Sequence, residues 1–207
     1  MRSIAGIGTL PTGATLRSMT LQRTFRQTGL ALLALPLLAI SALAQDAEEG
    51  TALDRLFAQL AEPDQPGWQQ IEQSIVAELS KSGSPAMDLL LQRGRDALKD
   101  EDYQTALNHL TALTDHAPDF AEGWNTRATA YFQTERYGLA MHDIGRALAL
   151  EPRHFGAMIG LATILREVGR EEEALTVLRE VQAINPHRDN VNQGIEQLAA
   201  RLEGDTL

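Results

Sequence analysis

The sequence predicts an all-α protein built as a solenoid of stacked helix–turn–helix repeats, with capping helices at both ends. Three observations support this prediction. Helix-forming runs end at three prolines spaced 34 residues apart, Pro118, Pro152 and Pro186. Between these prolines, apolar residues recur at the three- and four-residue spacing of one helix face. Small and bulky apolar residues keep the same register from one copy to the next, as a repeated supersecondary unit requires.

The composition fits one globular unit. The chain has 207 residues, of which 43% are hydrophobic and 22% are charged, close to the average for folded soluble proteins. It contains no cysteine, which excludes disulfides, zinc–thiolate sites, thiol catalysis and a lipidated cysteine. Packing alone must therefore stabilise the repeats.

Residues 1–44 are predicted to be a secretory signal peptide. They contain four arginines and no acidic residue, and their apolar stretch ends in the small-residue motif Ala-Leu-Ala. This layout predicts cleavage between Ala44 and Gln45, and a periplasmic or secreted mature chain. Residues 1–18 precede a second methionine, Met19, so they are a possible upstream extension and the true start stays open.

A retained membrane anchor is the alternative to cleavage. The apolar stretch is shorter than the ~20 residues that a spanning helix needs, and Pro36 interrupts it. We therefore expect no stable membrane insertion after cleavage. Without the leader, 14 basic residues face 28 acidic ones, so the net charge is about −14. Repulsion from phosphates then argues against nucleic acid and anionic lipid surfaces as partners.

Three repeats are expected, at residues 87–120, 121–154 and 155–188. Each copy has two apolar helical stretches separated by a short polar turn, so each forms a helix–turn–helix unit. Two positions of every copy hold small residues, where the paired helices can cross closely: Gly94, Ala128 and Ala162, then Ala106, Ala140 and Ala174. One unit cannot bury its apolar face alone, so we expect the copies to stack.

The repeat pattern resembles the tetratricopeptide repeat, a 34-residue helix–turn–helix family. The middle copy matches the family positions with Trp124, Ala128, Tyr131, Ala140, Ile144, Ala147 and Pro152. The other two copies match mainly at the same packing positions. Arg93 and Arg127 stand where the family usually has leucine, and Glu171 stands where tyrosine is common. Local packing is expected to differ at these three places.

Helices are also expected on both sides of the repeats. Over residues 45–86, two apolar helix faces separated by the breaker Gln-Pro-Gly predict an N-terminal helical pair or a degenerate repeat. Ser84 and Pro85 suit the N-cap and the first position of the helix that opens the first repeat. Residues 189–207 are predicted to form a C-terminal capping helix with one solvated face.

The sequence contains no recognisable motif for catalysis or metal binding. The five histidines form no pair at i, i+4 and are expected on the surface. The serine-rich stretch at residues 80–85 is typical of a turn and a helix start, not of a nucleophile elbow. We therefore predict no catalytic, metal-binding or cofactor-binding residues, and a protein that is not an enzyme.

The resemblance implies a binding groove. In this family the first helix of each unit lines a concave surface that often holds an extended or helical peptide. Transferred by position, the residues expected to line it are Arg95, Asn125, Thr129, Phe132, Thr163 and Arg166. Phe132 would supply apolar contact and Arg95 a fork of donors. An open alternative is that Leu91 and Leu98, on the same face, pack against the N-terminal helices.

One subclass of the family holds the acidic tail of a chaperone with a clamp of lysine, arginine and asparagine. The matching places in this chain hold Leu91, Arg95, Thr126, Gly156 and Gly160. Only Arg95 could act in such a clamp, so we expect a different kind of ligand.

The preferred hypothesis is an exported, non-enzymatic scaffold or adaptor of the cell envelope that binds a protein or peptide segment in the groove. The first alternative is a module that associates with its own copies. The second, less favoured, is a subunit of an envelope hydrolase. The partner, the oligomeric state and the choice between the concave and convex faces stay open at this stage.

Overall fold

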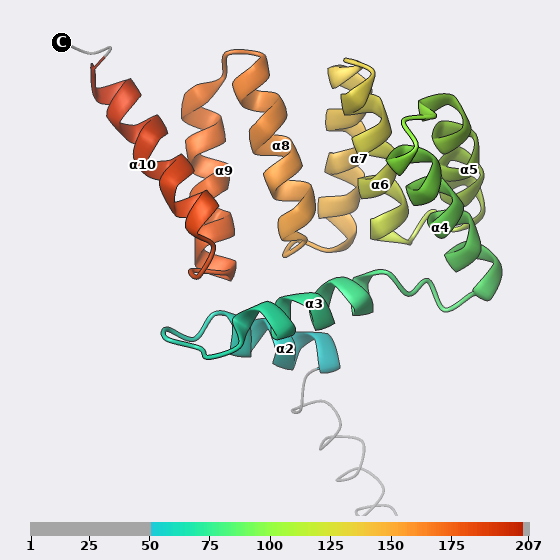
Figure 1. The fold of residues 1–207 in the computed structure, drawn as a ribbon, viewed down its shortest axis with the longest axis horizontal. Coiled ribbons are helices and arrows are strands. Elements are labelled where there is room, and N and C mark those ends of the chain that lie inside the picture. Colours follow the sequence, from blue (N-terminus) through green and yellow to red (C-terminus); the bar gives the residue numbers. More distant parts are fainter. Residues whose placement is uncertain (1–50, 205–207) are drawn as a thin grey trace, which may run out of the picture. The chain divides into compact units, whose positions relative to one another are not determined.

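The computed structural model describes residues 51–204, so the signal peptide predicted at residues 1–44 lies outside the described part. Every regular element in residues 51–204 is an α-helix, which confirms the predicted fold class (Figure 1). The helices are α2 (Ala52–Leu60), α3 (Trp68–Leu79), α4 (Pro85–Lys99), α5 (Tyr103–His116), α6 (Ala121–Gln133), α7 (Tyr137–Leu150), α8 (Phe155–Glu167), α9 (Glu171–Ile184) and α10 (Asp189–Gly204).

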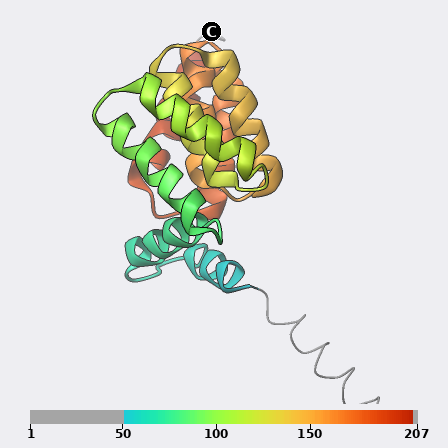
Figure 2. The ribbon, with the colours of Figure 1, turned by 90° about the vertical axis from the view of Figure 1, so that its right-hand side faces the viewer.

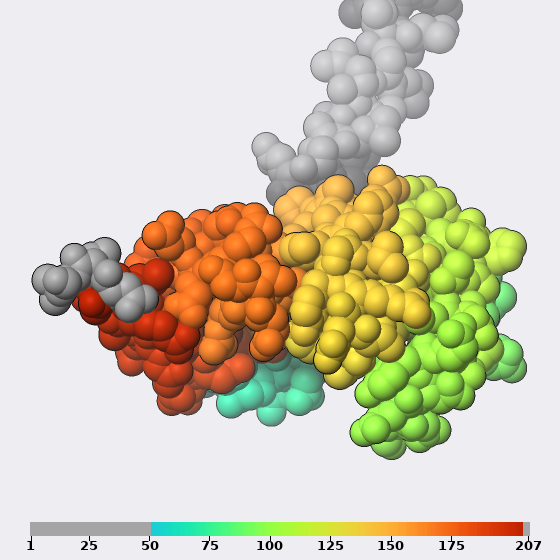
Figure 3. Space-filling model, turned by 90° about the horizontal axis from the view of Figure 1, so that it is seen from above, coloured from blue at the N-terminus to red at the C-terminus, as the bar shows by residue number. Residues whose placement is uncertain are grey.

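The three repeats are the antiparallel pairs α4–α5, α6–α7 and α8–α9, which lie side by side and end at α10 (Figure 3). The evenly spaced prolines explain where the second helix of each pair ends. Each proline follows a residue in a non-helical conformation: Ala117 has ψ 67°, Glu151 has ψ 96° and Asn185 has ψ 92°. A proline excludes the helical conformation from the residue before it, so all three helices stop one residue earlier still.

The small residues lie where the paired helices cross. Ala140 and Ala174 are completely buried. A Cβ atom built on Gly94 would lie only 2.5 Å from Cδ2 of Leu110, so the first repeat has no room for a side chain there. The recurring small residues therefore set how closely the two helices of each repeat approach.

Two departures from the family pattern are compensated by polar contacts. Arg127 donates two hydrogen bonds to Asp143 on α7, at 2.6 and 2.9 Å, and one to Thr114 on α5, at 2.7 Å. Asp143 is 1% exposed, so a buried ion pair takes the place of an apolar contact between the helices. Glu171 accepts a hydrogen bond from Arg201 on α10 at 2.6 Å, which joins the last repeat to the capping helix.

The N-terminal pair α2–α3 packs against the C-terminal half of the array. Phe57, Leu60 and Ile75 share one buried cluster with residues of α8, α9 and α10. In Figure 2 this pair (cyan to green) lies beneath the repeats. Leu91 and Leu98 belong to a separate apolar cluster, which is formed by the first repeat and α6 and includes no residue of α2 or α3.

Within residues 51–204, every helix is too short or too polar to cross a lipid bilayer.

Candidate functional site

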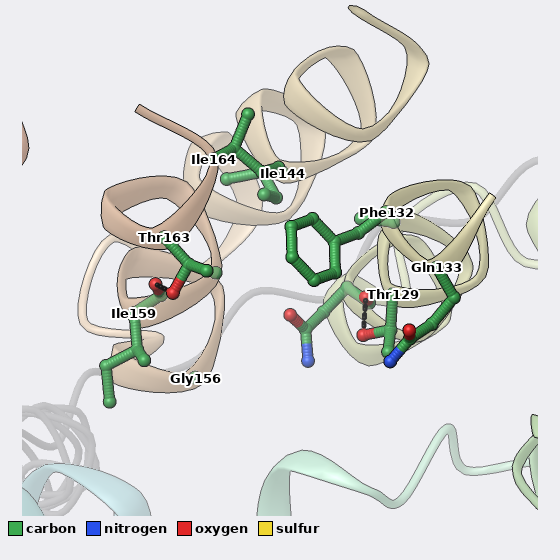
Figure 4. Close-up of a pocket in the computed structure, with 11 residues that line it drawn as sticks. Thr129, Phe132, Gln133, Ile144, Gly156, Ile159, Thr163 and Ile164 are labelled. Carbon is green, nitrogen blue, oxygen red and sulfur yellow. Dashed lines mark hydrogen bonds between the residues drawn. The ribbon is translucent and has the colours of Figure 1, made fainter. Parts of the chain in front are cut away.

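A pocket of about 300 Å³ opens between α6 and α8, the first helices of the second and third repeats (Figure 4). The residues that line it come from α6, α7 and α8: Asn125, Ala128, Thr129, Phe132, Gln133, Ile144, Gly156, Ile159, Gly160, Thr163 and Ile164. We call the side of the array formed by α4, α6 and α8 the first-helix face.

The floor of the pocket is apolar. Ala128, Ile144 and Ile164 lie at the contact between the two repeats and are almost fully buried. The ring of Phe132 projects from α6 toward α8 (Figure 4) and packs on Tyr137, with 5.8 Å between the ring centroids. An apolar side chain that entered the pocket would be surrounded by aliphatic and aromatic groups, which favours its transfer from water.

Two glycines on α8 create the space. Gly156 and Gly160 are one helical turn apart and both line the pocket. A Cβ atom on Gly160 would meet only Cδ1 of Ile144, at 3.6 Å, an ordinary contact distance. The helix could therefore carry a side chain at position 160, and glycine there leaves room that a larger residue would occupy.

The rim of the pocket is polar and uncharged. The hydroxyls of Thr129 and Thr163 donate to carbonyls one turn earlier in their own helices, at 3.2 and 2.9 Å. Their oxygens stay able to accept hydrogen bonds from a ligand, and Gln133 adds an amide with both donors and an acceptor. Such a rim can hydrogen-bond the main chain of a peptide without requiring a charge.

A buried carboxylate lies at one end of the pocket. Glu122, 7% exposed, accepts hydrogen bonds from His154 at 2.8 Å, from Asn125 at 3.1 Å and from Thr126 at 3.2 Å. It also pairs with Arg95 of the first repeat. His154 is the N-cap of α8, and its Nδ1 accepts from the backbone N–H of Ala157. Its Nε2 therefore donates to Glu122.

The environment of Glu122 favours its ionised form. Burial by itself raises the pKa of a carboxyl group. The hydrogen bond from His154, together with the charge and hydrogen bond of Arg95, opposes this effect, and the pKa of Glu122 lies below its ordinary value. We call Glu122, Arg95 and His154 the Glu122 cluster; through one negative charge it joins α4, α6 and the residue that caps α8.

The structure brings together four of the six residues predicted for the groove. Asn125, Thr129, Phe132 and Thr163 all line the pocket. The other two do not line it: Arg95 is held in the Glu122 cluster and also donates to Ser80 at 3.1 Å, and Arg166 lies exposed farther along α8. The guanidinium of Arg95 is thus already paired within the protein.

The sequence analysis named Gly156 and Gly160 only as places without a clamp residue, and it missed both the opening that they leave and the buried cluster. Gly156 and Gly160 interrupt a good helix at i, i+4, and unexplained glycines inside a helix are the signal that could have identified the opening. The expectation that the histidines lie on the surface is wrong for His154, which is 4% exposed. Its partner Glu122 is 32 residues away, and nothing in the local sequence pairs them.

No group of histidine and acidic side chains within the described residues is arranged to hold a metal ion.

The repeat region of the chain is similar to known proteins. The tetratricopeptide repeat family model matches residues 91–149 and 126–189. A TPR repeat-containing protein of Rhizobium etli is 36% identical over 154 residues, which cover 74% of this chain and 76% of that protein. Sperm-associated antigen 1 of Mus musculus is 27% identical over 111 residues, which cover 54% of this chain but only 12% of that protein.

Solved structures show the same helical arrangement. The first TPR domain of Spaghetti (RPAP3), solved with the HSP90 peptide SRMEEVD, superposes with a TM-score of 0.56 at 22% identity. The superposition covers 58% of this chain and 98% of that domain. At this level of identity the likeness concerns the fold of the repeats.

Proposed function

Because the chain belongs to the tetratricopeptide repeat family, we propose that it is a non-enzymatic interaction module. In this proposal a segment of another protein binds on the first-helix face and places an apolar side chain in the pocket between α6 and α8. The array has no catalytic role of its own and acts as a scaffold or adaptor.

One observation supports this proposal above the others: the pocket combines a buried apolar floor with an uncharged, hydrogen-bonding rim. Burial of an apolar side chain against the floor is favourable, and the rim can form hydrogen bonds with the peptide main chain on either side of that side chain. Peptide sites in proteins commonly consist of these two parts. Ile144, Ile164 and Phe132 would contact the anchor, while Thr129 and Thr163 would contact the main chain.

The charge of the site favours an uncharged segment over an acidic tail. Arg95 is the single basic residue of the chain at the places where clamp-type relatives would hold an acidic terminus, and Glu122 already neutralises it. A carboxylate entering near Arg95 would meet the charge of Glu122 at close range. The ligand we propose therefore differs in charge from the HSP90 peptide found with Spaghetti.

We further propose that this interaction takes place outside the cytoplasm, in the periplasm or cell envelope. The support comes from the leader pattern of residues 1–44, with its basic start, apolar stretch and Ala-Leu-Ala exit. The partner would then be another exported or envelope protein.

The test is affinity capture from cell-envelope extract by the purified chain beginning at Gln45, compared with two glycine variants. Gly160→Leu fills the pocket from the α8 side, where a Cβ atom meets only one ordinary contact. Gly145→Leu places the same side chain on α7, where a Cβ atom has nothing within 4 Å. We expect Gly160→Leu to lose the captured partner and Gly145→Leu to keep it, while both variants retain the helicity of the parent. Equal capture by all three proteins would rule out the pocket as the site.

A further inference from the structure

Helix α8 has unfilled space on two of its faces. The pocket described above lies on its α6 side. A second cavity, of about 270 Å³, lies where α8 meets α7 and α9, and is lined by Met141, Leu161, Leu165, Arg170, Glu173, Thr176 and Val177. Both cavities lie at the boundary between the second and third repeats. Both cavities are open to solvent, so the side chains that line them make fewer contacts across the boundary than a closed interface would provide.

Helix α3 contacts the array on both sides of this boundary. Glu72 accepts two hydrogen bonds from Arg188, at 2.6 and 2.8 Å, and one from Asn185, at 2.7 Å. Arg188 and Asn185 belong to the segment between α9 and α10. At the other end of α3, the hydroxyl of Ser80 accepts from Arg95 of the first repeat at 3.1 Å. One short helix therefore touches both the first and the last repeat.

Helix α2 contacts the start of α8 and the turn before it. The rings of Phe57 and Phe155 meet edge to face with their centroids 6.5 Å apart. Arg153, in the turn before α8, lies 4.3 Å over the ring of Phe57 and forms an ion pair with Asp54 at 2.8 Å. Leu60 is completely buried in the same cluster.

These contacts differ from those of a simple repeat array. In such an array each repeat touches only its neighbours, and the angle between two repeats depends on their shared interface alone. Here the bonds of Glu72 join residues 113 and 116 positions apart. A rotation that widened the boundary between the second and third repeats would have to break contacts of α2 or α3.

We propose that α2 and α3 act as a brace that spans the boundary between the second and third repeats and fixes the width of the pocket. No pocket-lining residue comes from either helix, so the brace acts through the position of α8. Glu72 and Arg188 are positioning residues in this arrangement. The inference does not depend on the proposed ligand, because it concerns the free protein.

The test is amide hydrogen exchange of the ligand-free chain, read segment by segment, for the parent and Glu72→Gln. Glutamine keeps the volume of the side chain but removes the negative charge of the carboxylate, to which two nitrogens of Arg188 donate hydrogen bonds. We expect exchange at residues 156–164 of α8 to become about tenfold faster or more, because opening of the boundary becomes easier. The matched control is Glu78→Gln on the same helix, which breaks an exposed pair with Lys81 at 2.5 Å. It should leave exchange in α8 unchanged.

A second variant, Arg188→Lys, serves if Glu72→Gln unfolds the whole chain. Lysine keeps the positive charge but cannot form the two-nitrogen contact, so a smaller increase in exchange over the same α8 segment is expected. The proposal is overturned if faster exchange is confined to α3 and the segment around Asn185 and Arg188. It is equally overturned if the control accelerates α8 as much as Glu72→Gln does.

Discussion

Replacement of Glu122 by glutamine tests whether the buried cluster holds α4, α6 and the residue that caps α8 together. In the parent, Oε1 of Glu122 accepts from Arg95 and Thr126, and Oε2 accepts from Asn125 and His154. All four lone-pair positions of the carboxylate are thus in use. A glutamine must place an NH₂ group where one of these oxygens was, so either the guanidinium of Arg95 or Nε2 of His154 would face another donor, whereas Thr126 and Asn125 can turn to accept.

The magnitude follows from these contacts. Each buried donor left without an acceptor costs about 1–3 kcal/mol. The side chain of Arg95 is 39% exposed, so water screens its share of the ion pair and we add little for the lost charge. We expect Glu122→Gln to lower the free energy of unfolding by about 1–3 kcal/mol at neutral pH.

Urea denaturation followed by circular dichroism measures this difference. Glu173→Gln on α9 is the matched control, because it removes a carboxylate from an exposed pair with Arg170, the residue before that helix. The control should unfold at the same urea concentration as the parent. A Glu122→Gln midpoint equal to that of the parent would refute the view that the cluster contributes to the contact between repeats.

Four further predictions can be tested, three of them based on the structure and the last on the sequence of the leader. Because the pKa of Glu122 is lowered in the folded state, its carboxylate adds to the free energy of unfolding at pH values above 4.5, the ordinary pKa of the group. This contribution is lost as the pH falls below that value. The difference in urea midpoint between the parent and Glu122→Gln should therefore become smaller in acid. Gly94→Ala should lower the free energy of unfolding by about 1–3 kcal/mol, because its Cβ meets Leu110 at 2.5 Å. Gly145→Ala, with open space around its Cβ, should raise it by about 0.5–1 kcal/mol, since alanine is the better helix former; thermal or urea unfolding checks both signs. Intact mass of the protein from its native host should correspond to a chain that begins at Gln45, whereas a product still containing the leader would contradict export.

The repeat architecture could be predicted from the sequence because its determinants are local and recur. A proline removes a backbone donor and restricts the residue before it, so Pro118, Pro152 and Pro186 set three helix ends wherever the chain folds. Ala140 and Ala174 stand at the same position of successive repeats, and their small side chains let the paired helices cross closely. Two of the departures from the family pattern, Arg127 and Glu171, turned out to be compensated by partners on other helices.

The site was only partly predictable because it depends on contacts between distant residues. Positional transfer from the family named Phe132 and Thr163, and both of them line the pocket between α6 and α8. It could not show that Arg95 would be paired with Glu122, because the two are 27 residues apart and their approach depends on how the repeats stack. The contact between Glu72 and Arg188 could not be predicted either, because no local pattern indicates contacts between segments more than a hundred residues apart.

Site-specific photo-crosslinking in the native host tests the central claim most directly. A benzoylphenylalanine at position 132 would place the reactive group in the pocket, in a side chain similar to that of Phe132. The control is the same group in place of Leu139, which is 49% exposed on α7, a second helix of its repeat. If a partner segment binds between α6 and α8, position 132 should give a discrete protein adduct that Gly160→Leu abolishes, and position 139 should give none. An adduct from position 139 alone would show that the partner binds the opposite face and would contradict the proposed site.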